Sequence, residues 1–409
     1  MMSMKIYTVG GYIRDQLLGI TSKDRDWVVV GATPEQMLQQ GYQAVGKDFP
    51  VFLHPETKQE YALARTERKT SAGYTGFQFN TSIDVTLEDD LIRRDLTINA
   101  IAQDEQGNII DPYQGQNDIK NKILRHVSPA FIEDPLRVLR VARFAARFAY
   151  LGFTIADETL ELMKEITASG EIESLVAERV WQELHSTLLT RNPEVFFKVL
   201  RECGALKILL PEIDCLFGVP QTKEYHPEID TGIHTLMVLE QAVKLSDDPE
   251  VRFAALLHDL GKGLTPKDQW PKHINHEHLG VSPVNEVCDR FKTPKSYREL
   301  ALMVTEYHLN YHRITELKPT TVIKYLQLMD AFRRPERFEK FLLACEADSR
   351  GRTGFEDREF EQPALFRRFF DAANTVDYSL LQQQGLQGKA FAEGLQKLRV
   401  TAVQNIKKA

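Results

Sequence analysis

The 409-residue sequence contains no run of about eighteen uncharged apolar residues, the length that a membrane-spanning helix requires. Its first residues, Met1 to Lys5, lead directly into an apparent strand rather than into the apolar core of a signal peptide. We therefore expect a cytoplasmic protein that makes no contact with a membrane.

Cysteine is scarce and widely spaced. The four cysteines form no Cys-x-x-Cys pair; they are Cys203, Cys215, Cys288 and Cys345. This spacing excludes a disulfide framework and a cysteine zinc site, so we expect reduced thiols.

The formal net charge of -7 argues against indiscriminate binding to nucleic acid. One segment nevertheless has the opposite balance. From Lys120 to Tyr150 there are seven lysines and arginines against Glu133 and Asp134, which is seven minus two, or +5. The chain therefore has room for one basic groove.

Two kinds of pattern divide the chain, which has no repeats and no low-complexity linker. Residues 4–123 alternate turns and short helices with β-like runs, an α+β pattern. The expected strands are Lys5–Val9, Asp26–Val30, Val51–His54 and Glu60–Ala64, and a helix is expected over Tyr12–Leu18. From Pro129 onward the apolar spacing is mostly helical, with a second helical unit expected to start near His226.

The first chemical motif combines a glycine turn with paired acids. Gly10 and Gly11 follow an apolar strand and precede a helix, where backbone amides and Arg14 can meet phosphates. Asp24 and Asp26 share one face of an extended chain, so their carboxylates can hold one divalent cation. An isolated Asp-x-Asp is usually only an acidic turn, but the glycines and the arginine beside it favour phosphoryl or nucleotidyl transfer.

A second motif crowds acids and arginines between Asp84 and Asp95. Arg94 can bind a triphosphate through two parallel hydrogen bonds. A third metal-binding carboxylate is expected among Glu88, Asp89 and Asp90, although a solvated helix cap explains these acids equally well.

A third motif is a helix that begins after Glu133 and Asp134. At about 100° per residue its arginines fall within an arc of roughly 120° and form one cationic face. They are Arg137, Arg140, Arg143 and Arg147. Arginine without lysine favours fixed contacts to phosphates or base edges, and Asp134 with Arg137 can offer an acceptor and donors to a nucleobase.

The C-terminal half contains an ordered set of histidines and acids that suits a divalent metal site with nickel, manganese or magnesium. The candidate ligands are His234, His258, Asp259, His276 and Asp348. Spacing does not decide which of His273, His276, His278 and His308 are ligands.

Four motifs, in this order, resemble a known family. They are Gly-Gly-x-x-Arg-Asp, Asp-x-Asp, Arg-Arg-Asp-x-Thr-Ile-Asn-Ala and Glu-Asp-Pro-x-Arg-x-Leu-Arg-x-x-Arg-Phe. The chain resembles the class II tRNA nucleotidyltransferases, the CCA-adding enzymes of the DNA polymerase beta superfamily, over nearly its whole length.

This resemblance implies that CTP and ATP are added to the 3′ end of tRNA without a nucleic-acid template. It implies that Asp24 and Asp26 hold Mg²⁺ and act as the catalytic residues. Gly11, Arg14 and Arg94 would hold the triphosphate and sugar. Arg137, Arg140 and Arg143 would complete the pocket, with Asp134 and Arg137 reading the base.

The histidine set resembles the HD phosphohydrolase superfamily, whose signature is the pair His258-Asp259. CCA-adding proteins that carry such a domain have 2′,3′-cyclic phosphodiesterase, 2′-nucleotidase and phosphatase activities. The resemblance thus implies repair of RNA ends with Ni²⁺ or another divalent metal.

The implied architecture is an α+β nucleotidyltransferase head followed by an all-α neck and body and an all-α HD domain. We expect the head at 1–123, the neck and body at 124–225, the HD domain at 226–350 and a helical tail at 351–409. The protein is expected to be a monomer or a homodimer.

Two rival interpretations remain. A bacterial poly(A) polymerase shares the nucleotidyltransferase motifs, but it usually carries a basic C-terminal extension and no HD signature. An RNA-binding scaffold without catalysis predicts that acids are missing from the metal site, whereas Asp24 and Asp26 are both present.

Overall fold

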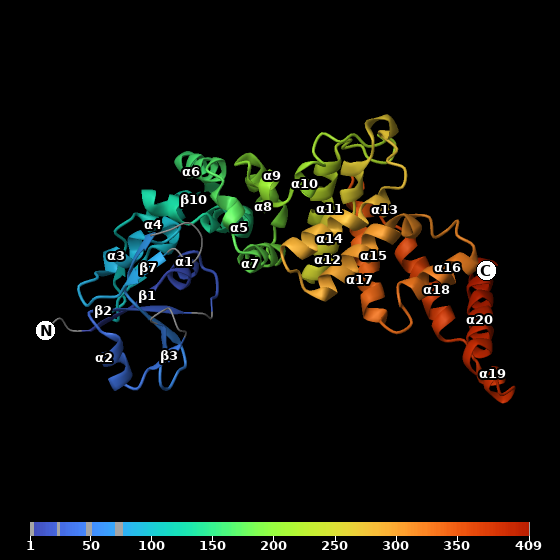
Figure 1. Ribbon diagram of the computed structural model, residues 1–409, viewed down its shortest axis with the longest axis horizontal. Coiled ribbons are helices and arrows are strands. Elements are labelled where there is room, and N and C mark those ends of the chain that lie inside the picture. Colours follow the sequence, from blue (N-terminus) through green and yellow to red (C-terminus); the bar gives the residue numbers. More distant parts are fainter. Residues whose placement is uncertain (1–3, 23–24, 46–50, 70–76, 409) are drawn as a thin grey trace. The chain divides into compact units, whose positions relative to one another are not determined.

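The computed structural model of the chain describes residues 4–22, 25–45, 51–69 and 77–408. The chain divides into two compact units, residues 1–209 and residues 210–409, and each is described by itself (Figure 1). Within the described ranges, no helix is both long enough and apolar enough to cross a membrane.

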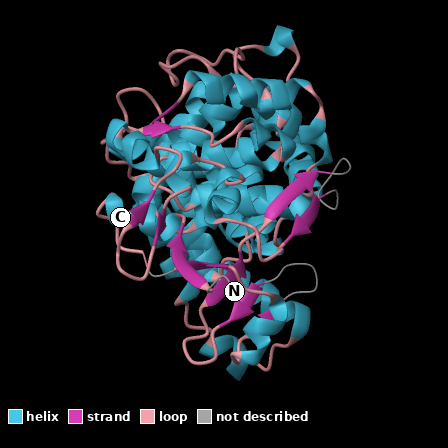
Figure 2. Ribbon diagram, turned by 90° about the vertical axis from the view of Figure 1, so that its left-hand side faces the viewer, coloured by secondary structure: helices cyan, strands magenta, loops and turns pink. Residues whose placement is uncertain are grey.

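The first unit is built on a seven-stranded sheet with the strand order β3-β4-β5-β2-β1-β8-β9. Figure 2 draws the strands in magenta and the helices in cyan. The strands of this sheet are β1 (Lys5–Val9), β2 (Asp26–Val30), β3 (Gln43–Val45), β4 (Val51–Leu53), β5 (Glu60–Leu63), β8 (Ala102–Gln103) and β9 (Ile109–Ile110). Two separate pairs are β6 (Thr66–Lys69) with β7 (Phe77–Asn80), and β10 (Ile123–Leu124) with β11 (Thr154–Ile155).

The expected strands are confirmed, with small differences at their ends. β1 and β2 have the predicted bounds, whereas β4 and β5 each end one residue early. Helix α1 (Gly11–Leu17) begins and ends one residue before the expected helix. The strands β3, β8 and β9 were not expected, because runs of two or three residues are too short to show a period of two.

The central strand β2 is buried on both faces of the sheet. Val28 packs with Val9 and Leu91 in one apolar cluster, while Val29 packs in a second cluster with residues such as Phe52. Successive side chains of a strand point to opposite faces, so two adjacent valines serve two separate cores. Helix α3 (Leu87–Ile92) supplies Leu91 to the first cluster, and α2 (Pro34–Gln39) supplies a methionine to the second.

The register between β1 and β2 places the glycine turn beside Asp26. The two strands are antiparallel and pair Val9 with Asp26. The last residue of β1 therefore lies opposite the first residue of β2. Gly10, which follows at once, therefore begins its turn at the end of the strand pair where Asp26 lies.

Helix α5 (Leu136–Phe148) is the main packing partner in the helical part of the first unit. It contacts α7 (Ala177–Leu188) and α8 (Pro193–Glu202). The other helices of this part are α4 (Gly115–Asn121), α6 (Asp157–Ala168) and α9 (Ala205–Leu209). The mostly helical character expected after Pro129 is confirmed.

The described part of the second unit contains helices and no named strand. Its first six helices are α10 (Pro211–Asp214), α11 (Thr231–Leu245), α12 (Pro249–Leu257), α13 (His276–Leu279), α14 (Val281–Arg290) and α15 (Lys295–His312). The others are α16 (Pro319–Leu328), α17 (Pro335–Arg350), α18 (Gln362–Asn374), α19 (Ser379–Gln383) and α20 (Gly388–Lys408). The candidate metal ligands lie on or directly after helices that pack on one another: α11, α12, α15 and α17, with α13 packed on α15.

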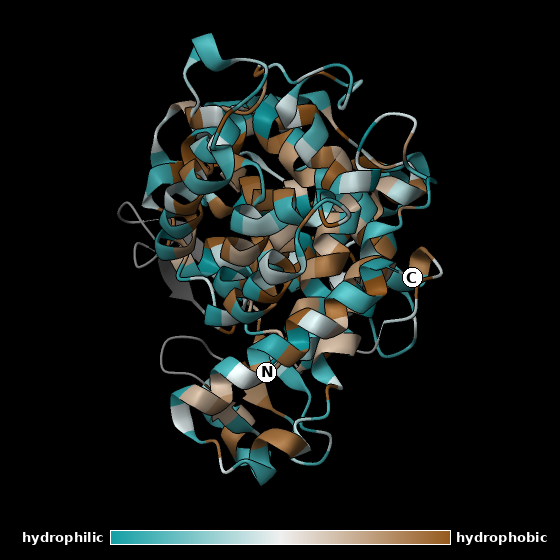
Figure 3. Ribbon diagram, turned by 90° about the vertical axis from the view of Figure 1, so that its right-hand side faces the viewer, coloured by the Kyte–Doolittle hydropathy of each residue, from teal (hydrophilic) through white to brown (hydrophobic). Residues whose placement is uncertain are grey.

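Small residues let these helices approach closely. Val238 and Ala242 of α11 contact Ala255 of α12 and Ala347 of α17. Figure 3 shows that most helices carry both hydrophobic residues, in brown, and hydrophilic residues, in teal. The unit begins at Leu210, upstream of the start expected near His226, because α10 belongs to it. The finer four-part division of the chain stays a prediction.

We predict that Leu91→Ala lowers the free energy of unfolding of the first unit by about 2–5 kcal/mol, because Leu91 is fully buried behind β1 and β2. Denaturant unfolding followed by tryptophan fluorescence measures the change, since Trp27 lies on β2. The neighbouring Ile92 is 42 % exposed, so Ile92→Ala is the matched control. Equal losses in the two variants would contradict the proposed core.

Candidate functional site

A cavity of about 550 Å³ opens in the first unit beside the glycine turn. Nine arginines and three aspartates line it, a balance of nine minus three, or +6. The arginines are Arg14, Arg65, Arg93, Arg94, Arg137, Arg140, Arg143, Arg147 and Arg179, and the aspartates are Asp26, Asp95 and Asp134. A cavity of this charge and size attracts a polyphosphate anion.

The two glycines allow guanidinium groups to approach the backbone. Gly10 has a φ of 70°, a conformation that side chains other than hydrogen disfavour. A Cβ atom on Gly10 would lie 2.7 Å from Nη1 of Arg94, and one on Gly11 would lie 3.3 Å from Nη2 of Arg14. A larger residue at Gly10 would therefore displace an arginine from the cavity wall.

Arg14 is buried, and its guanidinium group is held by Asp15 and Asn99. Its Nη2 lies 2.7 Å from Oδ1 of Asp15, and its Nη1 donates to the side-chain oxygen of Asn99. Burial lowers the pKa of Arg14, and Asp15 opposes that shift. The other oxygen of Asp15 accepts a 2.8 Å hydrogen bond from Arg147, so one carboxylate ties α1 to α5.

Asp90 holds the double arginine. It is fully buried and lies 2.9 Å from Nη2 of Arg93 and 3.2 Å from Nη2 of Arg94. Burial alone would raise the pKa of Asp90, but Arg94 and Arg93 leave it below its usual value. The carboxylate therefore stays charged and orients two side chains of the cavity wall.

The third acid expected among Glu88, Asp89 and Asp90 stays undecided. Asp89 forms a capping box with Thr86 at the start of α3, and the backbone carbonyl of Glu88 accepts a bond from Tyr113. None of the three acids lines the cavity in the part of the chain that the structure describes.

Asp95 pairs with the arginine face of α5. Its Oδ2 accepts from Nε of Arg140 at 2.8 Å, and its Oδ1 accepts from the amide of Asn99 at 2.8 Å. Burial would raise the pKa of Asp95, but Arg140 and Asn99 lower it, and Asp95 in turn raises the pKa of Arg140. The pair fixes the first two turns of α5 against the head.

The two residues expected to read the base are both rigidly placed at the wall of the cavity. Asp134 accepts from the backbone amide of Leu136 at 3.0 Å and lies 3.4 Å from Nη2 of Arg179. Arg137 donates to the backbone oxygens of Ala130 and Arg93. Such fixed groups present donors and acceptors at set positions, as selection of a base requires.

Apart from the undecided third acid, every described residue that the sequence assigned to the nucleotide site lines this one cavity: Asp26, Gly11, Arg14, Arg94, Asp134, Arg137, Arg140 and Arg143. Asp24 lies outside the described residues. Sequence reasoning missed Arg65, Asn99, Phe144 and Arg179 as lining residues. Asn99 and Phe144 belong to motifs already singled out, whereas Arg65 and Arg179 stand outside any motif.

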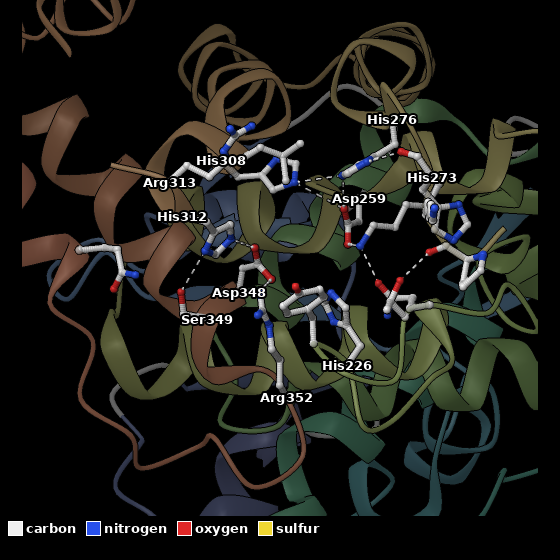
Figure 4. Close-up of a pocket in the computed structure, with 18 of the residues that line it drawn as sticks. His226, Asp259, His273, His276, His308, His312, Arg313, Asp348, Ser349 and Arg352 are labelled. Carbon is white, nitrogen blue, oxygen red and sulfur yellow. Dashed lines mark hydrogen bonds and ion pairs between the residues drawn. The ribbon is translucent and has the colours of Figure 1, made fainter. Parts of the chain in front are cut away.

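A second cavity, of about 610 Å³, lies in the second unit and is lined by five histidines (Figure 4). They are His226, His273, His276, His308 and His312. Asp259 and Asp348 also line it. His308 and His312 are four residues apart on α15 and therefore share one face of that helix.

One group of donor atoms gathers around Asp348. Its Oδ1 lies 3.1 Å from Nε2 of His234 and 3.7 Å from Nε2 of His258. These three residues are buried, and their donor atoms lie within 4.8 Å of one another. The group combines three helices: His234 lies on α11, Asp348 lies on α17, and His258 directly follows α12.

A second group centres on Asp259, which also lies beside His258 of the first group. Oδ2 of Asp259 lies 3.1 Å from Nε2 of His258, whereas Oδ1 lies 3.3 Å from Nε2 of His276 and 3.7 Å from Nε2 of His308. Figure 4 shows His276 and His308 pointing toward Asp259. The carboxylate of Asp259 thus faces two sets of imidazoles.

Buried donor atoms without partners fit a divalent cation. Nε2 of His258 and both carboxylate oxygens of Asp259 are buried and make no hydrogen bond of good geometry, although Nζ of Lys262 lies 2.6 Å from one oxygen. Burial would lower the pKa of His258, but Asp259 and Asp348 raise it to about 10. These carboxylates therefore favour positive charge at this point.

The second nitrogen of each central imidazole is held by the backbone. Nδ1 of His258 lies 2.8 Å from the oxygen of Ala255, and Nδ1 of His276 lies 2.8 Å from the oxygen of His273. Nδ1 of His308 lies 3.0 Å from the oxygen of Thr305. Metal-binding histidines are usually oriented by such a bond, which leaves Nε2 for the metal.

The geometry separates the histidines that spacing left open. His276 and His308 direct Nε2 to Asp259, whereas the two ring nitrogens of His273 bond Thr265 and the backbone oxygen of Pro220. His278 is exposed. His308 was left as an open candidate because its partner Asp259 is 49 positions away in the chain.

Gly261 explains how α13 approaches the His-Asp pair. A Cβ atom on Gly261 would lie 2.0 Å from the backbone oxygen of His276 and 2.5 Å from the backbone nitrogen of Gly280. Only glycine allows this contact, which brings His276 to Asp259.

Comparisons with known proteins match different families to the first and second units. The chain matches the family described as Poly A polymerase head domain over residues 6–125, and the family described as HD domain over residues 231–334. Residues 152–216 match a family described as the probable RNA and SrmB-binding site of polymerase A.

Curated relatives extend over the full length. A multifunctional CCA protein of Vibrio campbellii is 60% identical over 400 residues, which is 98% of each chain. A multifunctional CCA protein of Hahella chejuensis is 59% identical over 404 residues, 99% of this chain and 96% of that one.

Solved structures show the same fold at low identity. The Thermotoga maritima CCA-adding enzyme complexed with tRNA is 22% identical with a TM-score of 0.65, covering 98% of this chain and 88% of that one. A CCA-adding enzyme complexed with CTP is also 22% identical with a TM-score of 0.65, covering 98% and 87%.

The α+β head, the arginine-lined cavity and the helical HD domain define a nucleotidyltransferase with an appended HD domain. At 60% identity over nearly its whole length, the chain belongs to the family of multifunctional CCA proteins. The expected fold class is confirmed.

We predict that Asp90→Asn weakens the binding of a nucleoside triphosphate about tenfold, because loss of one charge-assisted contact corresponds to about 1.4 kcal/mol or more. A neutral amide no longer orients Arg93 and Arg94. Titration calorimetry on folded protein measures the dissociation constant. The exposed Asp84 contacts neither arginine in the described structure, so Asp84→Asn is the control; an unchanged constant for Asp90→Asn would refute the positioning role.

Proposed function

We propose that the chain adds CCA to the 3′ end of tRNA from CTP and ATP, without a nucleic-acid template. The observation that carries this proposal is the cavity that brings Asp26, the glycine turn and nine arginines together. Two comparisons support it. The curated relatives are named multifunctional CCA proteins, and related structures of CCA-adding enzymes are complexes with tRNA, CTP or ATP.

The proposed metal for this reaction is Mg²⁺, held by Asp24 and Asp26. Asp26 lines the cavity at the first position of β2, and carboxylate and phosphate oxygens are the ligands that Mg²⁺ prefers. A magnesium ion there supplies activation of the RNA 3′-hydroxyl and neutralisation of the charge on the pyrophosphate. Gly11, Arg14 and Arg94 are the proposed contacts to the triphosphate and sugar.

The proposed base-selecting residues are Asp134 and Arg137, supported by Arg140 and Arg143. The hydrogen bonds to Leu136, Ala130 and Arg93 hold them in place before a nucleotide binds. A base with the wrong pattern of donors and acceptors leaves buried polar groups unpaired, at about 1–3 kcal/mol for each lost partner. This difference favours C and A over U and G.

We expect the purified protein to add C, C and A to a tRNA that lacks these nucleotides when all four triphosphates are present. Sequencing of the products measures the added nucleotides. The double variant Asp24→Ala with Asp26→Ala should lose incorporation while its circular dichroism spectrum is unchanged, because the acids hold the metal and not the core. A homopolymeric A tail would support a poly(A) polymerase instead, and full incorporation by the double variant would contradict the metal assignment.

We propose that the second cavity is a hydrolytic site with 2′,3′-cyclic phosphodiesterase, 2′-nucleotidase and phosphatase activity for repair of tRNA ends. Its proposed ligands are His234, His258, Asp259, His276 and Asp348, to which the geometry adds His308. The proposed metal is Ni²⁺ or another divalent ion, since the donors are imidazoles and carboxylates. Bound there, a metal supplies an activated water and a positive charge for the phosphate.

The cavity wall adds cationic groups that suit a phosphoester. Lys262, Lys272, Arg313 and Arg352 line it together with the histidines. The proposed partners of the protein are tRNA, CTP and ATP. The cytoplasmic location and the monomer-or-homodimer alternative stay predictions.

We expect His258→Ala to eliminate hydrolysis of a 2′,3′-cyclic nucleotide and to lower the number of divalent ions bound, while CCA addition is retained. The reason is that Nε2 of His258 lies near the carboxylates of Asp259 and Asp348, and all three residues belong to the second unit, whereas the proposed CCA-adding site belongs to the first. Colorimetric phosphate release, metal analysis and the tRNA assay are the three measurements. His278→Ala, at an exposed position of the same unit, is the control; equal loss of both activities would refute two independent sites.

A further inference from the structure

A third cavity, of about 450 Å³, lies in the first unit and has no role in the function proposed above. Arg143 and Arg147 line this cavity as well as the nucleotide cavity, so the two share part of one wall. The remaining lining residues are Ile20, Tyr150, Ser186, Leu189, Thr190 and Arg191. A ligand here would lie next to the site where a nucleotide is transferred.

The charge of the third cavity favours an anion. Three arginines and no acid line it. Arg143 and Arg147 are paired from behind with Glu183 and Asp15. In the described parts of the chain Arg191 makes no ion pair, so its charge stays available to a ligand.

An exposed aromatic surface lies beside this charge. Tyr150 is 46 % exposed, and the guanidinium carbon of Arg191 lies 4.9 Å from the centre of its ring. Leu189 is 54 % exposed at the same cavity. A ring with a guanidinium group nearby, next to a cationic groove, is the arrangement that binds single-stranded nucleic acid through base stacking and phosphate contacts.

We infer that this cavity binds the single-stranded 3′ end of the RNA substrate, with a phosphodiester at Arg147 and Arg191 and a base against Tyr150. The inference rests on the proposed function, in which the RNA end must meet the nucleotide held in the adjoining cavity. Ser186, Leu189 and Arg191 fall within residues 152–216, the segment that matches a probable RNA-binding family. A second free nucleotide offers the same chemistry, and the experiment below distinguishes the two sources.

The test measures steady-state AMP addition to a tRNA that ends in CC. For Arg191→Ala and for Tyr150→Ala we expect the KM for tRNA to rise about five- to tenfold, since a stacked base or a phosphate contact is lost. The KM for ATP should change less than twofold, and Tyr150→Phe, which keeps the ring, should behave like the unchanged protein. Arg201→Ala, which removes an exposed arginine from the same unit outside these cavities, is the control.

A binding measurement separates this inference from the proposed function. Fluorescence anisotropy with a labelled RNA oligonucleotide ending in CC needs no catalysis. Arg191→Ala should lower the slope of log affinity against log salt by about 0.7, the value for one phosphate contact on a single strand. If the unchanged protein fails to extend tRNA but Arg191→Ala still lowers the salt slope of oligonucleotide binding, the proposed function is contradicted and the RNA site is retained.

Three outcomes would overturn the inference. The first is an unchanged KM for tRNA and unchanged oligonucleotide binding in both alanine variants. The second is an equal rise in the KM for ATP and for tRNA, which would assign the cavity to the nucleotide already bound next to it. The third is weaker binding of free CTP in both alanine variants with oligonucleotide binding unchanged, which would identify the ligand as a second free nucleotide.

Discussion

Repulsion among nine arginines at one cavity is the constraint on which the first unit depends. Like charges this close destabilise a fold unless acids compensate them. Three compensating acids stand behind the wall rather than in the cavity: Asp15, Asp90 and Glu183. Each binds a guanidinium group on its protein side, so the opposite side remains turned to the ligand. Asp95 does the same for Arg140 from the wall itself.

These pairs also connect elements that are far apart in the sequence. Asp15 joins α1 to α5, and Asp95 joins the segment that follows α3 to the same helix. The helix that is proposed to select the base is therefore fixed to the turn that is proposed to hold the phosphates. Asp90 contributes a local pair, because Arg93 and Arg94 follow it by three and four residues. The ion pairs that neutralise the arginines of the first unit are therefore also the contacts that hold those arginines in position.

The second unit presents the opposite arrangement. There the buried donors are carboxylates and imidazoles, and Nε2 of His258 and both carboxylate oxygens of Asp259 make no hydrogen bond of good geometry. A cation completes such a group, just as an anion completes the arginine cavity. The close packing of α11, α12 and α17 on small residues and the glycine at position 261 bring these donors together. The proposed nucleotidyl transfer and the proposed hydrolysis therefore rest on complementary electrostatics in two separate units.

Local sequence determined the elements and the residue types of both sites. Strong β-branched runs predicted β1 and β2, and the spacing of arginines predicted one face of α5, because neighbouring residues decide these patterns. The candidate nucleotide residues other than Asp24 were found together in one cavity. Sequence left open His276 against His273 and His278, and gave no signal for Arg65, Arg179 or the cavity around Tyr150 and Arg191. Only the tertiary structure shows which of these side chains lie together, because this depends on atoms that come within a few ångströms although their residues are tens of positions apart.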